Sequence, residues 1–148
     1  MSTLLEMLAV ARATGDFQPL IDAIPYARFL GLQAVEDQGQ QVAKLVYQPE
    51  LIGNPALPAL HGGTLGALLE STAVFELFFS SQTVLLPKTI TVTIDYLRSA
   101  KPLDTYAKGT ITRQGRRVVT VSVRAWQEDP DKPVATANAH LLVMAPES

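Results

Sequence analysis

The chain has no cysteine, which excludes a disulfide framework, a thiolate nucleophile and a cysteine-ligated metal or iron–sulfur cluster. It also has no excess of basic residues, because 12 Lys and Arg stand against 14 Asp and Glu. The resulting net charge of −2 argues against a nucleic-acid partner. No apolar run approaches the length of a membrane span, and no basic residue precedes the apolar part of the N-terminus. We therefore expect a cytoplasmic protein with no membrane partner.

The 148 residues, 47% of them hydrophobic, suffice for one domain with a sizeable core and are too few for two. Within this single domain, residues 1–148, residues 1–30 are expected to form an N-terminal helical extension. Ser2 is a plausible N-cap for a short helix that ends before Gly15, and a second helical stretch covers residues 19–30 with an interruption at Pro25.

The most apolar stretch, residues 60–80, has the length of a buried helix and carries apolar side chains around nearly its whole circumference. Only Glu70 and Glu76 bear charge within it. A carboxylate near the middle of an enclosed helix requires a partner, a raised pKa or a water-filled site. Glu70 is therefore the main candidate for chemistry.

Strand patterns surround this helix in the sequence. Residues 32–47 alternate about a turn at 37–39, and four further runs follow at 89–96, 106–112, 118–126 and 134–144. Residues 48–60 contain three prolines and are expected to form an ordered loop without regular structure. Gly115 is the expected positive-φ residue of the turn at 113–117, and Thr89 is expected on the strand face opposite Ile90 and Val92. We predict an α+β fold, with an antiparallel β-sheet wrapped around one long central helix.

Four segments carry a family resemblance: PYARFLGL before the first strand, HGG with Glu70 nine positions after its histidine, TVTIDYLRSAKPLD, and TRQGRRVVTVSVRAWQED. In this order, over residues 25–143, they resemble hotdog-fold acyl-CoA thioesterases of the phenylacetate-pathway type. The resemblance implies a hotdog fold, an acyl-CoA substrate and no cofactor. It also implies a homodimer with joined sheets, often paired into a homotetramer, and an active site at the dimer interface.

The expected catalytic group is Glu70, acting either as general base on water or as nucleophile through a mixed anhydride. The amides of Gly62 and Gly63, at the start of the helix, would polarise the thioester carbonyl. His61 is expected to order the loop by hydrogen bonds in preference to transferring a proton. Thr89 either approaches the thioester, as the resemblance implies, or is simply a strand residue that faces solvent.

The resemblance also implies an amide side chain six positions before His61, where the chain has Pro55. Asn54, one residue earlier, is the candidate for that position. The resemblance extends to Arg98, and together with Arg116 and Arg117 it would bind the phosphates of coenzyme A. The alternative for Arg116 and Arg117 is a solvated turn.

Helix geometry independently indicates a shared site. His61 and Glu70 lie about 180° apart around one helix and roughly 13 Å apart along it, so one chain cannot bring the glycine amides to its own carboxylate. Glu70 can meet the glycines of a second chain.

Other functions fit the sequence less well. A non-catalytic acyl-CoA-binding protein on this fold would lose the acid, and Glu70 is present. An enoyl-CoA hydratase would require an Asp and a His in a short motif, and NPALPALH contains no such Asp. Ser71 is in no G-x-S-x-G pattern, which disfavours a serine hydrolase, and His140 has no partner at metal-ligand spacing, so no metal site is expected.

Overall fold

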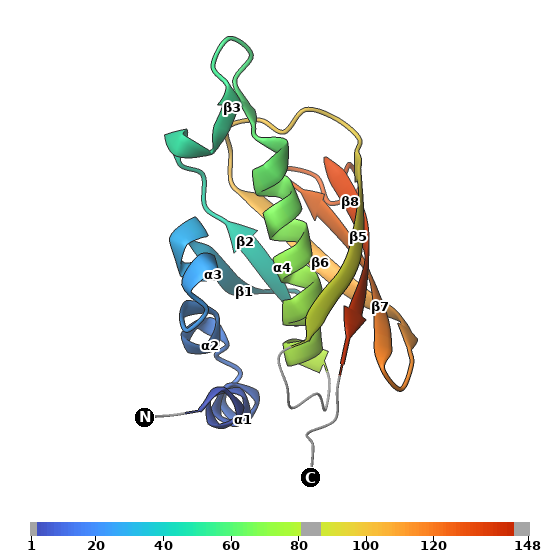
Figure 1. The fold of residues 1–148 in the computed structure, drawn as a ribbon. Helices are drawn as coiled ribbons and strands as arrows, with labels where there is room; N and C mark the ends of the chain where they lie inside the picture. The colour runs from blue at the N-terminus through green and yellow to red at the C-terminus, as the bar shows by residue number, and fades with distance from the viewer. Residues whose placement is uncertain (1–2, 81–86, 144–148) are drawn as a thin grey trace.

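The computed structural model describes residues 3–80 and 87–143 (Figure 1). In chain order the elements are helices α1 (Leu4–Thr14), α2 (Gln18–Asp22) and α3 (Pro25–Leu30), strands β1 (Leu32–Asp37) and β2 (Gln40–Leu45), a 3-10 turn (Pro49–Leu51), strands β3 (Ile52–Asn54) and β4 (Ala59–Leu60), helix α4 (Gly62–Ser80), and strands β5 (Lys88–Tyr96), β6 (Thr105–Gln114), β7 (Val118–Trp126) and β8 (Ala135–Leu142). No helix in the described ranges is long and apolar enough to cross a membrane.

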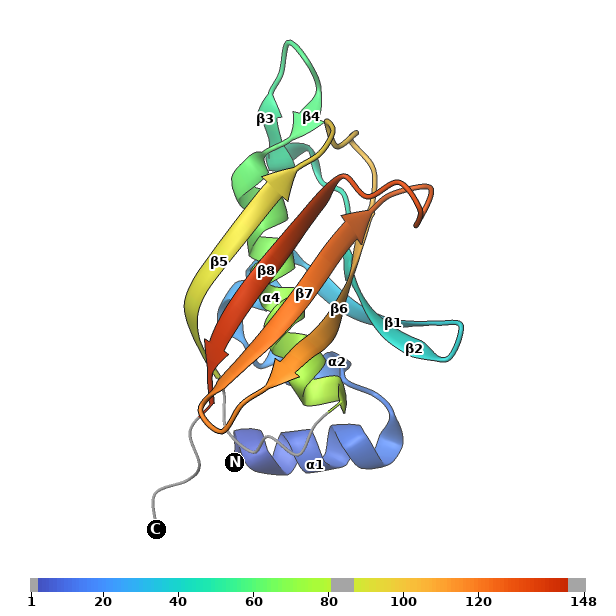
Figure 2. The same ribbon diagram turned by 90° about the vertical axis from the view of Figure 1, so that its right-hand side faces the viewer.

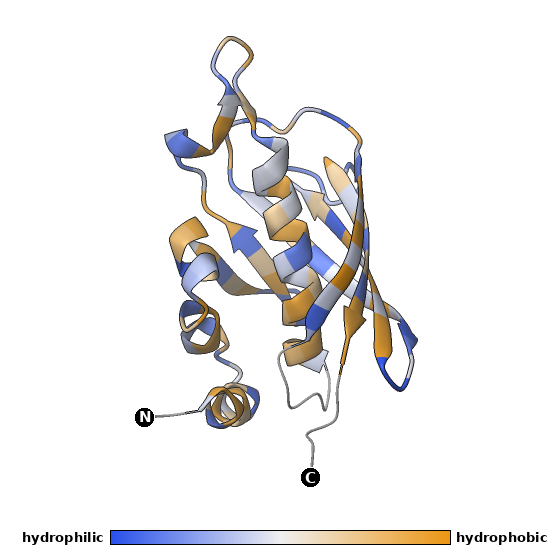
Figure 3. Ribbon diagram, viewed as in Figure 1, coloured by the Kyte–Doolittle hydropathy of each residue, from blue (hydrophilic) through white to orange (hydrophobic). Residues whose placement is uncertain are grey.

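The predicted α+β architecture is confirmed. One antiparallel sheet with the strand order β1-β2-β6-β7-β8-β5 packs its inner face against α4 (Figure 2). Alternate residues of β7 and β8 form the buried face of the sheet. All of them except Leu141 are alanine or valine: Val119, Val121, Val123, Ala125, Ala135, Ala137, Ala139 and Leu141. The apolar residues of α4 and the alternation on these strands are visible in Figure 3. Alanine along β8 leaves room for the leucines and phenylalanines of the helix.

The N-terminal extension docks on the far end of α4. Thr3 is the N-cap of α1 and forms a capping box with Glu6, whereas the predicted cap, Ser2, lies outside the described residues. Gly15 ends the helix in the left-handed conformation. The guanidinium of Arg12 donates to the carbonyl of Phe78 at 3.2 Å, which satisfies one of the free carbonyls at the C-terminus of α4.

The extension also covers one edge of the sheet. The side-chain amide of Gln18 donates to the carbonyl of Leu32 at 3.1 Å and accepts from the amide of Ala34 at 2.9 Å. Gln18 thus occupies two outward-facing hydrogen-bonding groups at the start of β1. At the other edge, β5 has no strand beside it in the described chain. The two edges of the sheet therefore differ, and only β5 is open to a further strand.

The predicted hairpin at residues 32–47 is confirmed, with positive φ at both Gln38 and Gly39, as a tight two-residue turn requires. The turn after β6 corrects a prediction, because Gly115 is not among the described residues with positive φ. A Cβ at Gly115 would lie 2.6 Å from the carbonyl oxygen of Val118, which accepts the Gly115 amide at 2.9 Å. Close backbone approach, and not a left-handed φ, is the reason for glycine here.

The proline-rich segment before α4 was predicted to lack regular structure, and this is wrong. It forms the 3-10 turn and the short β3–β4 hairpin, which projects beyond the start of α4 (Figure 1). Pro55 and Pro58 lie in the tip between the strands, where no ladder hydrogen bond is lost. Gly53 packs so closely on His61 that a Cβ would come 2.9 Å from its Cα. The hairpin is thereby fixed to the start of the helix.

The buried carboxylate of α4 is Glu76, which is 7% exposed. Lys108 Nζ donates to Glu76 Oε2 at 2.9 Å and to the carbonyl of Gln41 at 3.2 Å. Because β2 pairs with β6 only through residues 105–107, Lys108 fills the gap where the two strands separate. Burial raises the pKa of Glu76 above its ordinary value of 4.5, against the opposing effect of Lys108. Of the two carboxylates that the sequence placed on this helix, Glu76 is the desolvated one, and Glu70 is exposed in the single chain.

Replacement of Glu76 by Gln should change how stability depends on pH. The folded chain holds the Glu76 proton more tightly than the unfolded chain, so the free energy of unfolding of the wild type should fall relative to Glu76→Gln as pH rises from 4.5 through the raised pKa. Urea unfolding of both proteins at pH values from about 4 to about 8 measures the difference. Glu36→Gln, which removes an exposed carboxylate of β1, is the control. A difference that stays constant over this pH range would contradict the prediction.

Candidate active site

Glu70 belongs to a stripe of α4 that runs along β5. Gly62, Gly66 and Glu70 are four residues apart and so share one face of the helix. At the helix start, the Tyr96 hydroxyl donates to the carbonyl of Gly62 at 2.8 Å. Two turns further, the Thr89 hydroxyl donates to Glu70 Oε2 at 3.3 Å. The helix start therefore lies at the end of β5, and Glu70 lies at its beginning.

A β-bulge turns Thr89 toward Glu70. Thr89 pairs with Leu141 and Thr91 pairs with His140, so Ile90 is an extra residue without a partner on β8. The extra residue breaks the predicted alternation and moves Thr89 to the sheet face that packs on α4, while Ile90 becomes 52% exposed. The expectation that Thr89 lies on the face opposite Val92 is wrong for this reason.

The carboxylate of Glu70 is exposed in the single chain, because the sheet covers other faces of α4. Beside it lies a cavity of about 350 Å³ between α3, α4 and the beginning of β5. Its lining is mostly apolar and consists of Ile24, Tyr26, Ala27, Glu70, Ser71, Val74, Phe75, Pro87, Lys88 and Thr89. Glu70 thus stands where an apolar cavity meets solvent.

His61 caps the helix. Its Nδ1 accepts the amide hydrogen of Gly63 at 2.8 Å, as an N-cap side chain does. The amide of Gly62 has no partner among the residues that the structure describes. Of the two backbone amides predicted as oxyanion donors, that of Gly62 is therefore free to bind a substrate oxygen, and that of Gly63 already donates to His61. This geometry agrees with the ordering role expected for His61.

Asn54 is not brought to Glu70 within one chain. Its Oδ1 accepts the amide of Ala56 at 3.0 Å and so shapes the tip of the β3–β4 hairpin. The hairpin sits at the start of α4, and Gly62 lies about 12 Å from Glu70 along an uninterrupted helix. The donors near Gly62 and the carboxylate of Glu70 therefore cannot act on one carbonyl group of the same chain.

Arg116 and Arg117 line a groove of about 1160 Å³ at the β6–β7 turn, together with Arg113 and His140. His140, expected to be structural, lies within hydrogen-bond distance of the Thr120 hydroxyl, at 3.1 Å. None of these arginines forms an ion pair within the described part of the chain. Within the described residues, the groove is therefore a concentration of positive charge without a counter-charge.

The structure separates Arg98 from the other two predicted arginines. Strand register puts Val118 level with Leu142 and Lys88, at the end of the sheet near Thr89. Arg98 follows Tyr96 at the opposite end. Thr89 and Tyr96 are seven residues apart on β5, which is about 23 Å along a strand. Arg98 and Arg117 of one chain therefore cannot hold the same phosphate.

Two parts of the site were missed in the sequence. Tyr96 was treated only as an apolar strand position, although its hydroxyl fixes the start of α4. The cavity side chains of α3 belong to the segment PYARFLGL, which carried the family resemblance without an assigned role. The motif was the available signal for α3.

Comparison with known proteins gives a family and a fold. A family model described as the thioesterase superfamily matches residues 57–134, which include Glu70, Thr89, Arg116 and Arg117. A solved structure from Chromobacterium violaceum is 38% identical, with 95% of this chain and 98% of that chain covered and a TM-score of 0.74. No functionally curated protein matches the chain.

Two further solved structures are similar. A phenylacetic acid degradation-related protein from Ralstonia eutropha JMP134 is 25% identical, with 81% of this chain and 91% of that chain covered and a TM-score of 0.70. A protein from Bacillus halodurans, solved with CoA, shares the fold at 17% identity, with 97% of this chain and 93% of that chain covered and a TM-score of 0.71. These matches confirm the fold and the family type that the motifs predicted.

Proposed function

This chain belongs to the thioesterase superfamily, and from that membership we propose that it hydrolyses an acyl-CoA thioester to a free acid and coenzyme A. The observation that carries the proposal is the carboxylate of Glu70, which accepts a hydrogen bond from Thr89 at the mouth of an apolar cavity. The structural neighbour solved with CoA supports coenzyme A as the thiol.

The active unit is a homodimer joined through β5. This edge strand is open, and Ile90 and Tyr96 expose apolar surface along it. Two chains related by a two-fold axis pair such edges in antiparallel fashion, so the end of one β5 meets the beginning of the other. Because Gly62 lies at the end and Glu70 at the beginning, the amide of one chain comes beside the carboxylate of its partner. Pairing of dimers into a homotetramer remains a prediction from the resemblance.

In the general-base route, Glu70 takes a proton from water as the water oxygen bonds to the carbonyl carbon. The partner's Gly62 amide, aided by the positive end of the helix dipole, stabilises the oxyanion. The carbon–sulfur bond then breaks, and the thiolate leaves and takes up a proton. In the nucleophilic route, a Glu70 oxygen bonds to the carbonyl carbon as sulfur leaves, and water hydrolyses the mixed anhydride. Thr89 orients the carboxylate in both routes.

The other predicted residues support the same site. The Gly63 amide would join that of Gly62 once His61 releases it, and Asn54 lies on the hairpin beside this helix start. Arg116 and Arg117 are at the same end of the sheet as Thr89, and the two-fold axis brings the partner's Arg98 to that end. Guanidinium groups there suit the phosphates of coenzyme A.

Glu70→Gln should lower kcat for benzoyl-CoA on the order of 10²- to 10⁴-fold, because the amide can neither accept the proton of water nor attack the carbonyl. Binding of the ester should be largely retained, since the lost interaction belongs to the transition state. Thiol release measures turnover, and Glu36→Gln, far from the cavity, should behave as wild type. Near-normal turnover by Glu70→Gln would contradict the role of Glu70. A wild type that binds acyl-CoA without releasing thiol would instead indicate a non-catalytic acyl-CoA-binding protein.

Arg116→Ala combined with Arg117→Ala should raise KM for benzoyl-CoA by about tenfold, because charge-assisted hydrogen bonds to the phosphates are lost. The same double variant should change KM much less for the benzoyl thioester of N-acetylcysteamine, which has no nucleotide. Steady-state kinetics with the two substrates makes the comparison within one protein. An equal rise of KM for both would place the arginines elsewhere than on the nucleotide.

A further inference from the structure

We propose that the cavity beside Glu70 receives the acyl group of the thioester and restricts it to compact, uncharged apolar acids of about ten non-hydrogen atoms. This inference rests on the proposed thioesterase function and assigns its substrate class. It also gives the N-terminal extension a part in specificity, through α3.

The position of the cavity favours the acyl group over the rest of the ester. Glu70 and Thr89 form part of its wall, so a thioester carbonyl held against Glu70 has its acyl carbon at the cavity mouth. The inner wall is closed by Ala27 and Phe75, which are both buried. The cationic groove of Arg116 and Arg117 is a separate hollow of the sheet, available to the nucleotide.

The volume sets the size of the acyl group. About 350 Å³ is at the small end of the range for small-molecule sites, roughly 300–1,000 Å³. At roughly 30 Å³ for a group the size of a water molecule, the cavity holds on the order of ten such groups. Hexanoyl, octanoyl and benzoyl groups fit within this limit. A palmitoyl chain exceeds this volume and would leave part of its length outside the open side of the cavity, as the rest of the coenzyme A ester must also lie.

The lining sets the polarity. The buried residues of the lining, Ala27, Phe75 and Pro87, are apolar, and among the described residues of the wall the charged groups are Glu70 and Lys88, which are both exposed. Each methylene of an apolar acyl group that is buried there strengthens binding by about fourfold. A second carboxylate carried to the inner end of the cavity would lose its hydration among apolar side chains, because Lys88 is at the exposed rim. Dicarboxylic acyl groups are therefore disfavoured.

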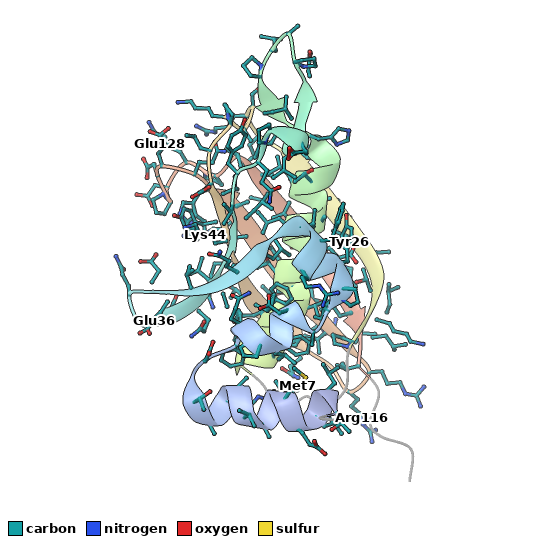
Figure 4. The ribbon with its side chains drawn as sticks, turned by 90° about the vertical axis from the view of Figure 1, so that its left-hand side faces the viewer. Met7, Tyr26, Glu36, Lys44, Arg116 and Glu128 are labelled. Carbon is teal, nitrogen blue, oxygen red and sulfur yellow. The ribbon has the colours of Figure 1, made fainter. Side chains whose placement is uncertain are left out.

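Two aromatic side chains of α3 extend the apolar wall outward. Tyr26 lines the cavity and is 55% exposed, and its ring stacks on that of Phe29, which is 80% exposed, with 6.2 Å between centroids. Figure 4 shows Tyr26 at the end of α3 that faces β5. Large apolar side chains with this exposure beside an apolar cavity are typical of a binding surface. Tyr26 is accordingly a size-limiting residue.

The test is hydrolysis of acetyl-, hexanoyl-, octanoyl-, benzoyl-, adipoyl- and palmitoyl-CoA by variants that fill or enlarge the cavity. The wild type should prefer the hexanoyl, octanoyl and benzoyl esters over the palmitoyl and adipoyl esters by at least about tenfold in kcat/KM. Val74→Phe should lower kcat/KM for octanoyl-CoA about tenfold more than for acetyl-CoA. Val74→Ala and Tyr26→Ala should raise the palmitoyl-to-octanoyl ratio. Val46→Phe, at a half-buried valine outside the cavity, should leave all ratios unchanged.

The outcomes separate the acyl cavity from the proposed function. Two results would contradict the assignment of the cavity to the acyl group without contradicting the thioesterase function. One is an equal loss of kcat/KM for all esters in Val74→Phe, and the other is a wild type that hydrolyses palmitoyl-CoA as well as octanoyl-CoA. Hydrolysis of none of these esters would overturn the thioesterase function and the acyl assignment with it. Because Tyr26 is exposed, Tyr26→Ala keeps the test valid even if Val74→Phe fails to fold.

Discussion

A helix that is apolar around most of its circumference has to be covered on every side, and one curled sheet cannot do this for α4. The sheet packs along α4, whose Leu68 and Leu69 are fully buried, and α1 covers the C-terminal end through Arg12. The stripe that remains, with Gly62, Gly66 and Glu70, lies beside the edge strand β5. The faces left uncovered by one chain are thus the faces that contain the candidate chemistry.

The bulge in β5 links assembly to the arrangement of the carboxylate. One extra residue, Ile90, moves Thr89 to the helix side, where its hydroxyl reaches Glu70, and turns an apolar side chain outward at the open edge. At the opposite edge, Gln18 of the N-terminal extension occupies two hydrogen-bonding groups of β1, whereas β5 has no partner strand in the described chain. The same extension supplies Tyr26 to the cavity. Helices α1 to α3, expected from the sequence only as an N-terminal helical extension, therefore contact both an edge of the sheet and the cavity beside Glu70.

Local patterns in the sequence were sufficient for the elements, since the period of apolar residues predicted α4 and the strands of the main sheet correctly. What depends on pairing between distant segments was not predictable. Thr89 changes face because of its register with β8, and Glu76 is neutralised by Lys108, 32 residues away. Strand register places Arg98 and Arg116 at opposite ends of the sheet, although both lie in segments that carried the family resemblance. The contact between His61 and Gly63 is local, and a histidine directly before two glycines at a helix start was a usable signal for an N-cap.

Shared use of Gly62 and Glu70 by two chains is tested most directly by mixing two inactive variants, Glu70→Ala and Gly62→Pro. Proline removes the amide donor and is tolerated at the first position of a helix, and the atoms nearest to a Cβ at Gly62 belong to the Tyr96 side chain, at an ordinary 3.4 Å. In a mixed dimer, one interface joins the intact amide to the intact carboxylate. Random mixing should therefore restore about a quarter of the wild-type sites, measured as thiol release from benzoyl-CoA. Mixtures as inactive as either parent, with both variants folded and exchanging subunits, would contradict a site built from two chains.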